Sequence, residues 1–157
     1  MNKVFFDLEW NTGFLDGNSF DEIIEIGAVK TDEEYRQIDG FRRLIRPVIY
    51  RKMNPYIQKI LAITMKDLQG EEPLASVAKA FFDWCGDCDT LIAWSGNDFG
   101  VLEKNLAHIG MKIPEQLGRY DVQMAYAYRT ENSIRNYALK AAVEAMELPE
   151  PEGQEYH

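Results

Sequence analysis

Two carboxylates near the N-terminus have the spacing of metal ligands on one strand. Asp7 and Glu9 lie in a segment rich in β-forming residues, directly after Phe5. Side chains alternate along a strand, so Asp7 and Glu9 share one face, while Phe6 and Leu8 point into a core on the other. Close carboxylates repel unless a cation lies between them, and oxygen ligands suit Mg²⁺ or Mn²⁺. The spacing alone leaves open an exposed edge strand with a solvated acidic face.

Two further aspartates stand at junctions between predicted elements. Asp98 follows the apolar segment 89–94, where a buried strand gives way to a helix. Folds of the α/β class place ligand groups at such junctions, and an Asp in a first helical turn is equally explained by the helix dipole. Asp121 precedes the helical segment 122–128, and a capping role is favoured there.

The elements that must position these acids begin with strands. β-Branched and aromatic residues predict strands over 3–8, 22–30, 37–46 and 89–94. The second and third are expected to pair antiparallel, and Ile24, Ile26 and Ala28 are expected on one face of the second. Residues 11–19 contain Asn, Gly, Asp and Ser and are predicted to form a turn.

Helices follow, predicted from apolar residues at helical spacing. They are expected around 57–64, 74–82 and 99–109, with a last helix from Ser133 to about Met146. The residues of the last helix expected to face inward are Ile134, Ala138, Ala141, Ala142 and Ala145. Strands first, then helices alternating with short strands, indicate an α/β fold with a mixed sheet flanked by helices.

The composition is that of one ordinary globular domain. The chain has 157 residues, of which 46% are hydrophobic and 27% charged. Lys and Arg number 17 and Asp and Glu 26, a net charge of −9. This balance counts against bulk electrostatic binding of nucleic acid, but not against an enzyme that meets phosphate through bound metal ions.

Location is inferred from what the sequence lacks. No apolar segment approaches the length of a membrane span, and carboxylates appear too early for a secretory signal. Two cysteines, Cys85 and Cys88, make no disulfide framework. A reducing, cytoplasmic location is therefore expected.

Three ordered motifs resemble the DEDDh 3′–5′ exonucleases, the group of RNase T and the proofreading subunit of bacterial DNA polymerase III. The Trp-x-Gly-Asn-Asp form of the second motif is most similar to the RNA-trimming exoribonuclease branch. The resemblance covers nearly the whole chain. The motifs are Asp7-x-Glu9 followed by 22–29 (EIIEIGAV), then 94–98 (WSGND), then 139–143 (LKAAV) with 152–157 (EGQEYH).

The resemblance implies a ribonuclease H-like fold and hydrolysis of phosphodiesters with two metal ions. Asp7 would bridge two Mg²⁺ or Mn²⁺ ions, Glu9 would hold one, and Asp98 would support the second directly or through water. His157 would be the general base for the attacking water, and a frayed terminal residue is its alternative. The family's fourth carboxylate lies five residues beyond this histidine. We therefore expect residues 1–157 to be a single exonuclease domain lacking the end of the third motif.

The substrate is expected to be the 3′ end of single-stranded nucleic acid, with RNA slightly preferred over DNA. The backbone around Leu8, Trp10 and Asn11 would receive the terminal nucleotide, and Trp10 would offer a stacking face. Packing within a loop explains Trp10 equally well. A cluster of basic residues would either steer the nucleic acid toward the site or guard the solvated edge of a β-strand. Its members are Arg42, Arg43, Arg46, Arg51 and Lys52.

Two other functions are weighed. The sequence Cys85-Gly86-Asp87-Cys88 imitates a thioredoxin motif, but it follows a predicted helix instead of opening one, and the nearby carboxylate would raise a thiol pKa. A redox function is therefore disfavoured. A catalytically silent module with a nuclease fold, which binds nucleic acid or a partner, is the alternative to an exonuclease.

Overall fold

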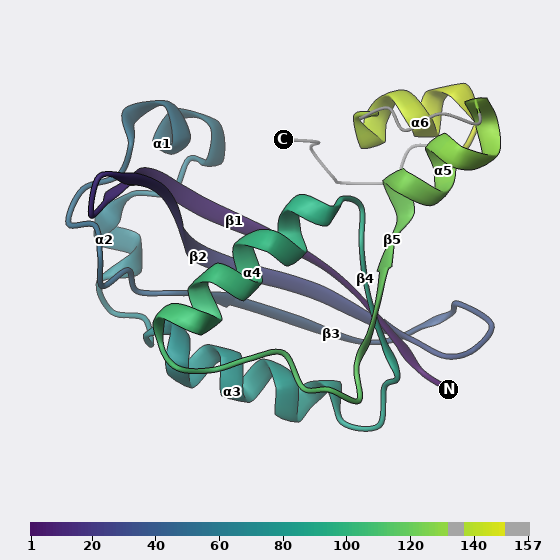
Figure 1. Ribbon diagram of the computed structural model, residues 1–157, viewed down its shortest axis with the longest axis horizontal. Helices are drawn as coiled ribbons and strands as arrows, with labels where there is room; N and C mark the ends of the chain where they lie inside the picture. The colour runs from purple at the N-terminus through teal and green to yellow at the C-terminus, as the bar shows by residue number, and fades with distance from the viewer. Residues whose placement is uncertain (132–136, 150–157) are drawn as a thin grey trace.

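The protein is a five-stranded mixed sheet with helices on its faces and ends (Figure 1). The computed structural model describes residues 1–131 and 137–149. The strands are β1 (Lys3–Leu15), β2 (Asn18–Thr31), β3 (Gln37–Leu44), β4 (Thr90–Ala93) and β5 (Gly118–Asp121). Their order is β3-β2-β1-β4-β5. The first three pair antiparallel, and β4 and β5 run parallel to β1. The predicted mixed α/β architecture is confirmed.

Six helices are described. They are α1 (Pro55–Leu61), α2 (Met65–Leu68), α3 (Leu74–Cys85), α4 (Gly96–His108), α5 (Val122–Glu131) and α6 (Leu139–Ala145). In Figure 1, α3 and α4 run along the sheet, while α1 with α2 and α5 with α6 lie at opposite ends. Nowhere in the described ranges is a helix long and apolar enough to cross a bilayer.

The first two strands form a hairpin much longer than predicted. Residues 11–15 and 18–19 were expected to belong to a turn, but they extend β1 and β2, and the prediction is wrong there. Only Asp16 and Gly17 turn the chain, with φ of 51° and 80°. An Asp-Gly pair with positive φ suffices for a two-residue hairpin turn, so the polar residues around it stay in the strands.

A bulge in β2 changes which residues share a face. Glu9 pairs with Glu25, but the next residue, Trp10, pairs with Ile23, so Ile24 is the extra residue. Ile26 packs in the main core and Ile24 in a second cluster. The expected common face for Ile24 and Ile26 is therefore wrong.

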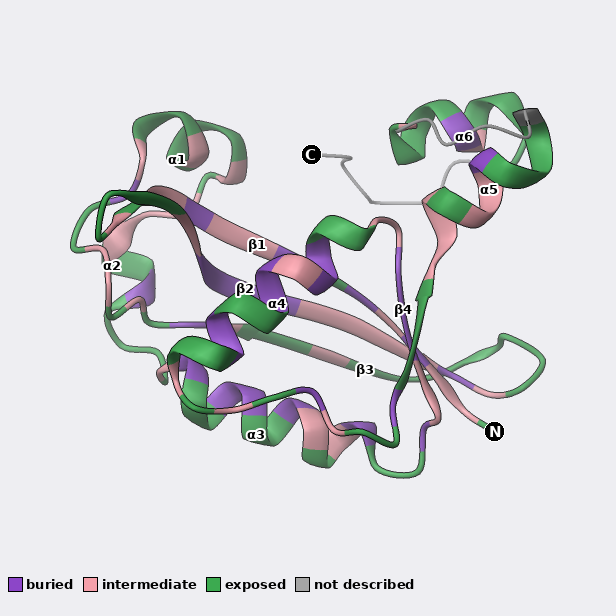
Figure 2. Cartoon of the chain, in the orientation of Figure 1, coloured by how far each residue is buried: buried purple, intermediate pink, exposed green. Residues whose placement is uncertain are grey.

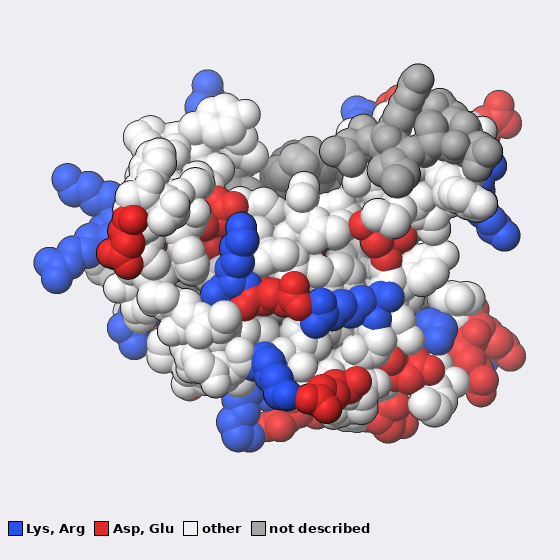
Figure 3. Space-filling view, in the orientation of Figure 1, with Lys and Arg blue, Asp and Glu red and all other residues white. Residues whose placement is uncertain are grey.

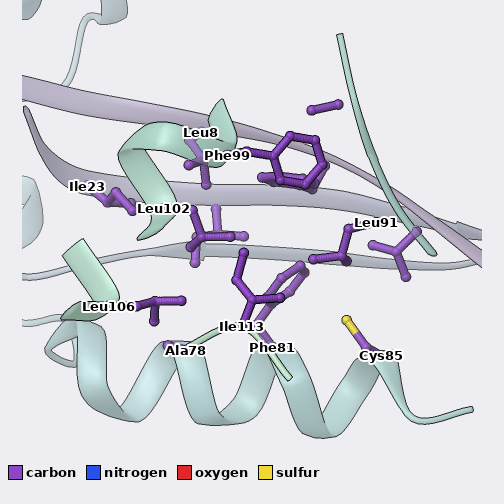
Figure 4. Packing of buried hydrophobic residues seen from close by; sticks show 14 of the residues in the cluster. Leu8, Ile23, Ala78, Phe81, Cys85, Leu91, Phe99, Leu102, Leu106 and Ile113 are labelled. Carbon is purple, nitrogen blue, oxygen red and sulfur yellow. The ribbon is translucent and has the colours of Figure 1, made fainter. Parts of the chain in front are cut away.

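The main core lies between the sheet and helices α3 and α4. Phe6 and Leu8 of β1 are buried there, and the Phe6 ring lies 5.1 Å from the Phe99 ring, edge to face. Figure 4 shows Leu8 and Leu102 in this layer, with Phe81 reaching it from α3. Burial of each large side chain stabilises the fold by roughly 1.5–3 kcal/mol.

A smaller apolar cluster lies on the opposite face, at the end of the sheet near α1 and α2. Leu44 belongs to it and stands directly across from Glu25, so it shares a face with Glu25 and Glu9. Its buried members are Ile24, Met53 and Leu68. Figure 2 shows buried residues along the central strands, whereas β3 and α6 are mostly exposed.

The C-terminal part differs most from expectation. The strand β5 was not predicted, because Gly-Arg-Tyr-Asp has no apolar alternation. Asp121 caps α5 as expected, accepting a hydrogen bond from the Met124 N–H at 2.8 Å. Of the last predicted helix only Leu139–Ala145 is helical among described residues, and 132–136 lie outside them. Ala142 is buried there, whereas the other alanines expected to face inward are exposed: Ala138, Ala141 and Ala145.

A buried amide attaches α4 to β2 where β3 has ended. Asn105 donates to the carbonyls of Asp21 at 2.7 Å and Val101 at 2.9 Å, and its Oδ1 accepts from the Ile23 N–H at 3.1 Å. The side chain thus supplies the hydrogen bonds that a neighbouring strand would supply.

We predict that Asn105→Ala lowers the free energy of unfolding by about 2–3 kcal/mol, because it leaves a buried N–H and carbonyl of β2 without a partner. Urea denaturation measures the change. Lys104→Ala, one residue away and exposed, is the control and should change stability by less than about 0.5 kcal/mol. Equal effects of the two variants would contradict the role of the amide.

Candidate active site

The face of β1 opposite the main core carries a row of acidic residues. Asp7 is exposed and Glu9 is half-buried, and they pair across to Gly27 and Glu25 of β2. Directly opposed residues share a sheet face, so Glu25 stands beside Glu9. A Cβ at Gly27 would meet nothing within 4 Å, which leaves space next to Asp7.

Asp98 reaches the same strand from the start of α4. Ser95 caps this helix: its Oγ accepts from the Asn97 N–H at 3.3 Å and donates to Asp98 Oδ2 at 3.2 Å. The buried Asp98 carboxylate also accepts a hydrogen bond from the backbone N–H of Leu8, which lies between Asp7 and Glu9. The N-terminus of α4 and the acidic part of β1 are therefore in direct contact.

This contact depends on β4 being short. In the described pairing β4 accompanies β1 only from Lys3 to Phe5. Beyond Phe5 the backbone edge of β1 that faces β4 is available to other groups, and the Leu8 N–H uses it to hold Asp98. The acids thus meet where a strand ends and a helix begins, as expected for Asp98.

The pKa values of Glu9 and Asp98 are raised, in both cases chiefly by burial. The pKa of Glu9 rises to about 7, chiefly because the carboxyl is buried and further because Asp7, Glu25 and Asp98 are negative. Burial also raises the pKa of Asp98, opposed by its hydrogen bonds with Ser95 and Leu8. A bound cation would relieve this excess of negative charge.

The donor chemistry fits a divalent metal ion, since the side chains offer only carboxylate oxygens. However, the residues from 1 to 131 and 137 to 149 include no group of three or more His, Cys, Asp or Glu arranged to hold an ion. Direct coordination by Asp7, Glu9 and Asp98 together therefore stays a prediction.

The three residues predicted to bind the substrate differ in how far their side chains are buried and in what those side chains contact. The side chain of Leu8 is buried in the main core, and Trp10 packs against that core in part. Asn11 is also buried: it donates to the Lys52 carbonyl at 3.0 Å, and its Oδ1 accepts from the Asn54 N–H at 2.8 Å. Leu8 and Asn11 could therefore contact a nucleotide only through their backbone. His157 lies outside the described residues.

Glu25 belongs to this acidic group, although the sequence alone showed it only as part of the motif 22–29. It is buried and forms an ion pair with Arg42 of β3. Arg42 pairs across to Gly27, in the same row as Asp7. Alternation along 22–29 shows which residues share a face with Glu25. Only the pairing of β1 with β2 shows that Glu25 lies on the same face of the sheet as Glu9.

The remaining sequence candidates lie elsewhere. Cys85 and Cys88 are buried free thiols at the end of α3, and burial raises the pKa of both, that of Cys85 to about 12. A thiolate is disfavoured there, in agreement with the rejection of redox chemistry. His108 is exposed near the end of α4, with its ring 5.6 Å from that of Phe20.

The fold and the acidic residues together define the class of protein to which this chain belongs. A mixed sheet ordered β3-β2-β1-β4-β5, with acids on β1 and at the start of α4, is a ribonuclease H-like nuclease fold. The family model described as Exonuclease, RNase T, matches residues 4–153, and the chain belongs to this family. The expected kinship with DEDDh exonucleases is confirmed, whereas the RNA-trimming branch is not.

A curated relative and solved structures agree with this assignment. The chain is 34% identical over 112 residues to DNA polymerase III PolC-type of Clostridium perfringens (strain 13 / Type A), an alignment that covers 70% of this chain and 7% of that protein. Cell-death related nuclease 4 matches with a TM-score of 0.75 and 14% identity over 94% of this chain and 55% of that one. The nuclease domain of 3′hExo, a DEDDh family member bound to rAMP, gives 0.74 and 16% over 94% and 79%. At these identities the structural matches show the fold.

The raised pKa of Glu9 predicts a pH dependence of stability without metal. The folded state holds this proton more tightly than the unfolded state, so ionisation between about pH 4.5 and 7 destabilises the fold. We expect Glu9→Gln to match the wild type near pH 4.5 and to be more stable by roughly 1 kcal/mol near pH 8, allowing for screening by water.

Urea denaturation in EDTA at both pH values provides the measurement. Glu72→Gln, at an exposed glutamate, is the control and should follow the wild type. A Glu9→Gln advantage that is the same at both pH values would refute the electrostatic origin.

Proposed function

We propose that residues 1–157 form one exonuclease domain that hydrolyses phosphodiester bonds at the 3′ ends of single-stranded nucleic acid with divalent metal ions. The observation that carries the proposal is the half-buried Glu9, whose pKa is raised to about 7 beside Asp7, Glu25 and Asp98. Such a concentration of acidic residues where β1, β2 and the start of α4 meet, in a chain of the RNase T family, is what a metal-dependent nuclease requires.

Asp7, Glu9 and Asp98 are the residues that would hold Mg²⁺ or Mn²⁺, two ions in the complete site. When bound, the ions activate water and stabilise the leaving 3′ oxygen. The chain itself orients its ligands: Ser95 and the Leu8 N–H fix the Asp98 carboxylate, and the core beneath β1 fixes Asp7 and Glu9. His157 is proposed as the general base.

The 3′-terminal nucleotide is proposed to lie against the backbone edge of β1 beyond Phe5. The backbone N–H and C=O groups of alternate strand residues point to the same edge of the strand. Those of Trp10 therefore lie on the edge where the Leu8 N–H contacts Asp98. Trp10 is also proposed as a stacking face. These contacts do not discriminate bases, which suits an enzyme that removes nucleotides in succession.

RNA is proposed as slightly preferred over DNA, on the Trp-Ser-Gly-Asn-Asp motif at 94–98. Structures with this fold include the nuclease domain of 3′hExo bound to rAMP and exonuclease I in complex with a dT13 oligonucleotide, so both ribonucleotide and deoxyribonucleotide ligands occur among them. A cytoplasmic location is part of the proposal, because Cys85 and Cys88 are free thiols.

A catalytically silent binding module is the second candidate. It is favoured by one observation: within 1–131 and 137–149, no three potential ligands are arranged around a metal position. Incubation of RNA and DNA oligomers labelled at the 5′ end separates the candidates, with Mg²⁺, Mn²⁺ or EDTA in parallel. A ladder of shortened products that depends on metal supports the exonuclease, and intact oligomers that still bind support the module.

Asp7→Asn and Glu9→Gln are each expected to reduce cleavage to less than about 1% of wild type, since loss of one oxygen ligand disables metal-assisted displacement. The fold should remain intact, because each substitution also removes repulsion. Product ladders and thermal unfolding measure the two effects. Asp16→Asn in the hairpin turn is the matched control, at an exposed acid with positive φ that Asn tolerates. Substantial cleavage by Asp7→Asn would sink the assignment.

A further inference from the structure

We propose that Arg51 and Lys52 form a subsite for the phosphodiester backbone of the nucleotides upstream of the 3′ end. The inference rests on the proposed function and assigns a contact to a loop outside the acidic site. Three observations carry it: the loop is held rigidly, it lies on the acidic face of β1, and its two cations have no acidic partner within the described structure.

The segment 48–54 is held by a buried carboxylate. Glu22 accepts hydrogen bonds from three successive backbone N–H groups, those of Val48 at 2.6 Å, Ile49 at 2.8 Å and Tyr50 at 2.9 Å. The Tyr50 hydroxyl donates to the Phe20 carbonyl at 2.9 Å. Charge-assisted bonds to a buried acceptor fix a backbone firmly, so the residues that follow have a defined position.

The other end of the segment is attached to the acidic strand. Asn11 follows Asp7 and Glu9 at the same alternation, and its amide binds the Lys52 carbonyl and the Asn54 N–H. Two residues of strand are about 7 Å, so the Lys52 backbone lies roughly that far along β1 from Glu9. A nucleic acid whose 3′ end lies at Glu9 and which runs along β1 toward Asn11 would pass this loop.

Within the segment only the two cations combine exposure with charge. Arg51 and Lys52 are exposed, while the next residue, Met53, is buried in the second cluster. Neither cation makes an ion pair in the described ranges, whereas Arg42 is paired with Glu25 and Arg46 binds the Glu71 carbonyl. Figure 3 shows Lys and Arg side chains projecting from the end of the molecule that bears α1 and α2.

Unpaired cations beside an acidic site attract phosphate groups by their charge and do not discriminate between bases. Their long side chains extend from a fixed backbone, so they can follow the phosphates of any sequence. In a chain of net charge −9, such a local positive region would also offset the repulsion between the protein and its substrate. An acidic protein segment is the competing occupant, and the experiment includes it.

The test compares the double variant Arg51→Gln/Lys52→Gln with Lys79→Gln/Lys112→Gln, which removes the same charge from exposed positions on α3 and just after α4. Binding of a fluorescent deoxythymidylate dodecamer is measured with Ca²⁺ between about 50 and 200 mM salt. Turnover of the dodecamer and of the p-nitrophenyl ester of thymidine monophosphate is measured with Mg²⁺. The ester lacks upstream phosphates, so it reports the catalytic centre alone.

The Arg51→Gln/Lys52→Gln variant should bind the dodecamer about tenfold more weakly. The slope of the logarithm of its binding constant against the logarithm of the salt concentration should fall in magnitude by about 1.4, since each lost phosphate contact removes about 0.7. The ratio of kcat/KM for dodecamer over ester should fall about tenfold as well. Unchanged binding, equal losses in both double variants, or equal losses on dodecamer and ester would each overturn the subsite. So would competition by polyglutamate as strong as that by unlabelled dodecamer.

The same measurements distinguish failure of the proposed exonuclease activity from failure of the proposed subsite. A wild-type protein that binds the dodecamer but hydrolyses neither substrate would disprove the exonuclease, while the affinities and salt slopes of the two double variants would still decide the subsite.

Discussion

Alternation along β1 is the constraint on which the rest of the molecule depends. Phe6 and Leu8 are buried against α3 and α4, and this burial forces Asp7 and Glu9 together on the opposite face. The apolar face stabilises the strand by several kcal/mol, more than one repulsive pair of half-exposed carboxylates costs. A strand can therefore hold acids at a spacing that they would avoid by themselves, and the site is built on the stability of the core beneath it.

Buried polar side chains take over where strand pairing stops. Past the end of β3, Asn105 supplies hydrogen bonds to the outer edge of β2. The neighbouring Glu22 accepts hydrogen bonds from three N–H groups of the segment 48–54. Asn11 does the same from β1. Each of these side chains is hydrogen-bonded to backbone partners, and together they attach the part of the β1–β2 hairpin where only two strands pair to α4 and to the segment 48–54.

The sequence predicted the parts of this protein that follow from local periodicity. The acidic face of β1, the position of Asp98 at the start of α4 and the cap at Asp121 all follow from alternation or helix-end chemistry. Features that depend on pairing between distant segments were missed. The bulge at Ile24 reassigns a face, Glu25 becomes a neighbour of Glu9 through register alone, and β5 pairs without an apolar pattern of its own. The backbone around Asn11 was expected to receive the terminal nucleotide, and only the folded structure shows that the Asn11 side-chain amide binds the segment 48–54.

Helix α4 joins two regions that the chain order keeps apart. Its first turn brings Asp98 to β1, and seven residues later Asn105 binds the β2 backbone at Asp21 and Ile23, on either side of Glu22. At about 1.5 Å per residue these two attachments are roughly 10 Å apart along a rigid rod. The distance between the acids and the segment 48–54, which Glu22 holds, is thereby fixed before any ligand binds. Inserting or deleting a residue in α4 would alter that distance, and it would also rotate one attachment by about 100° relative to the other.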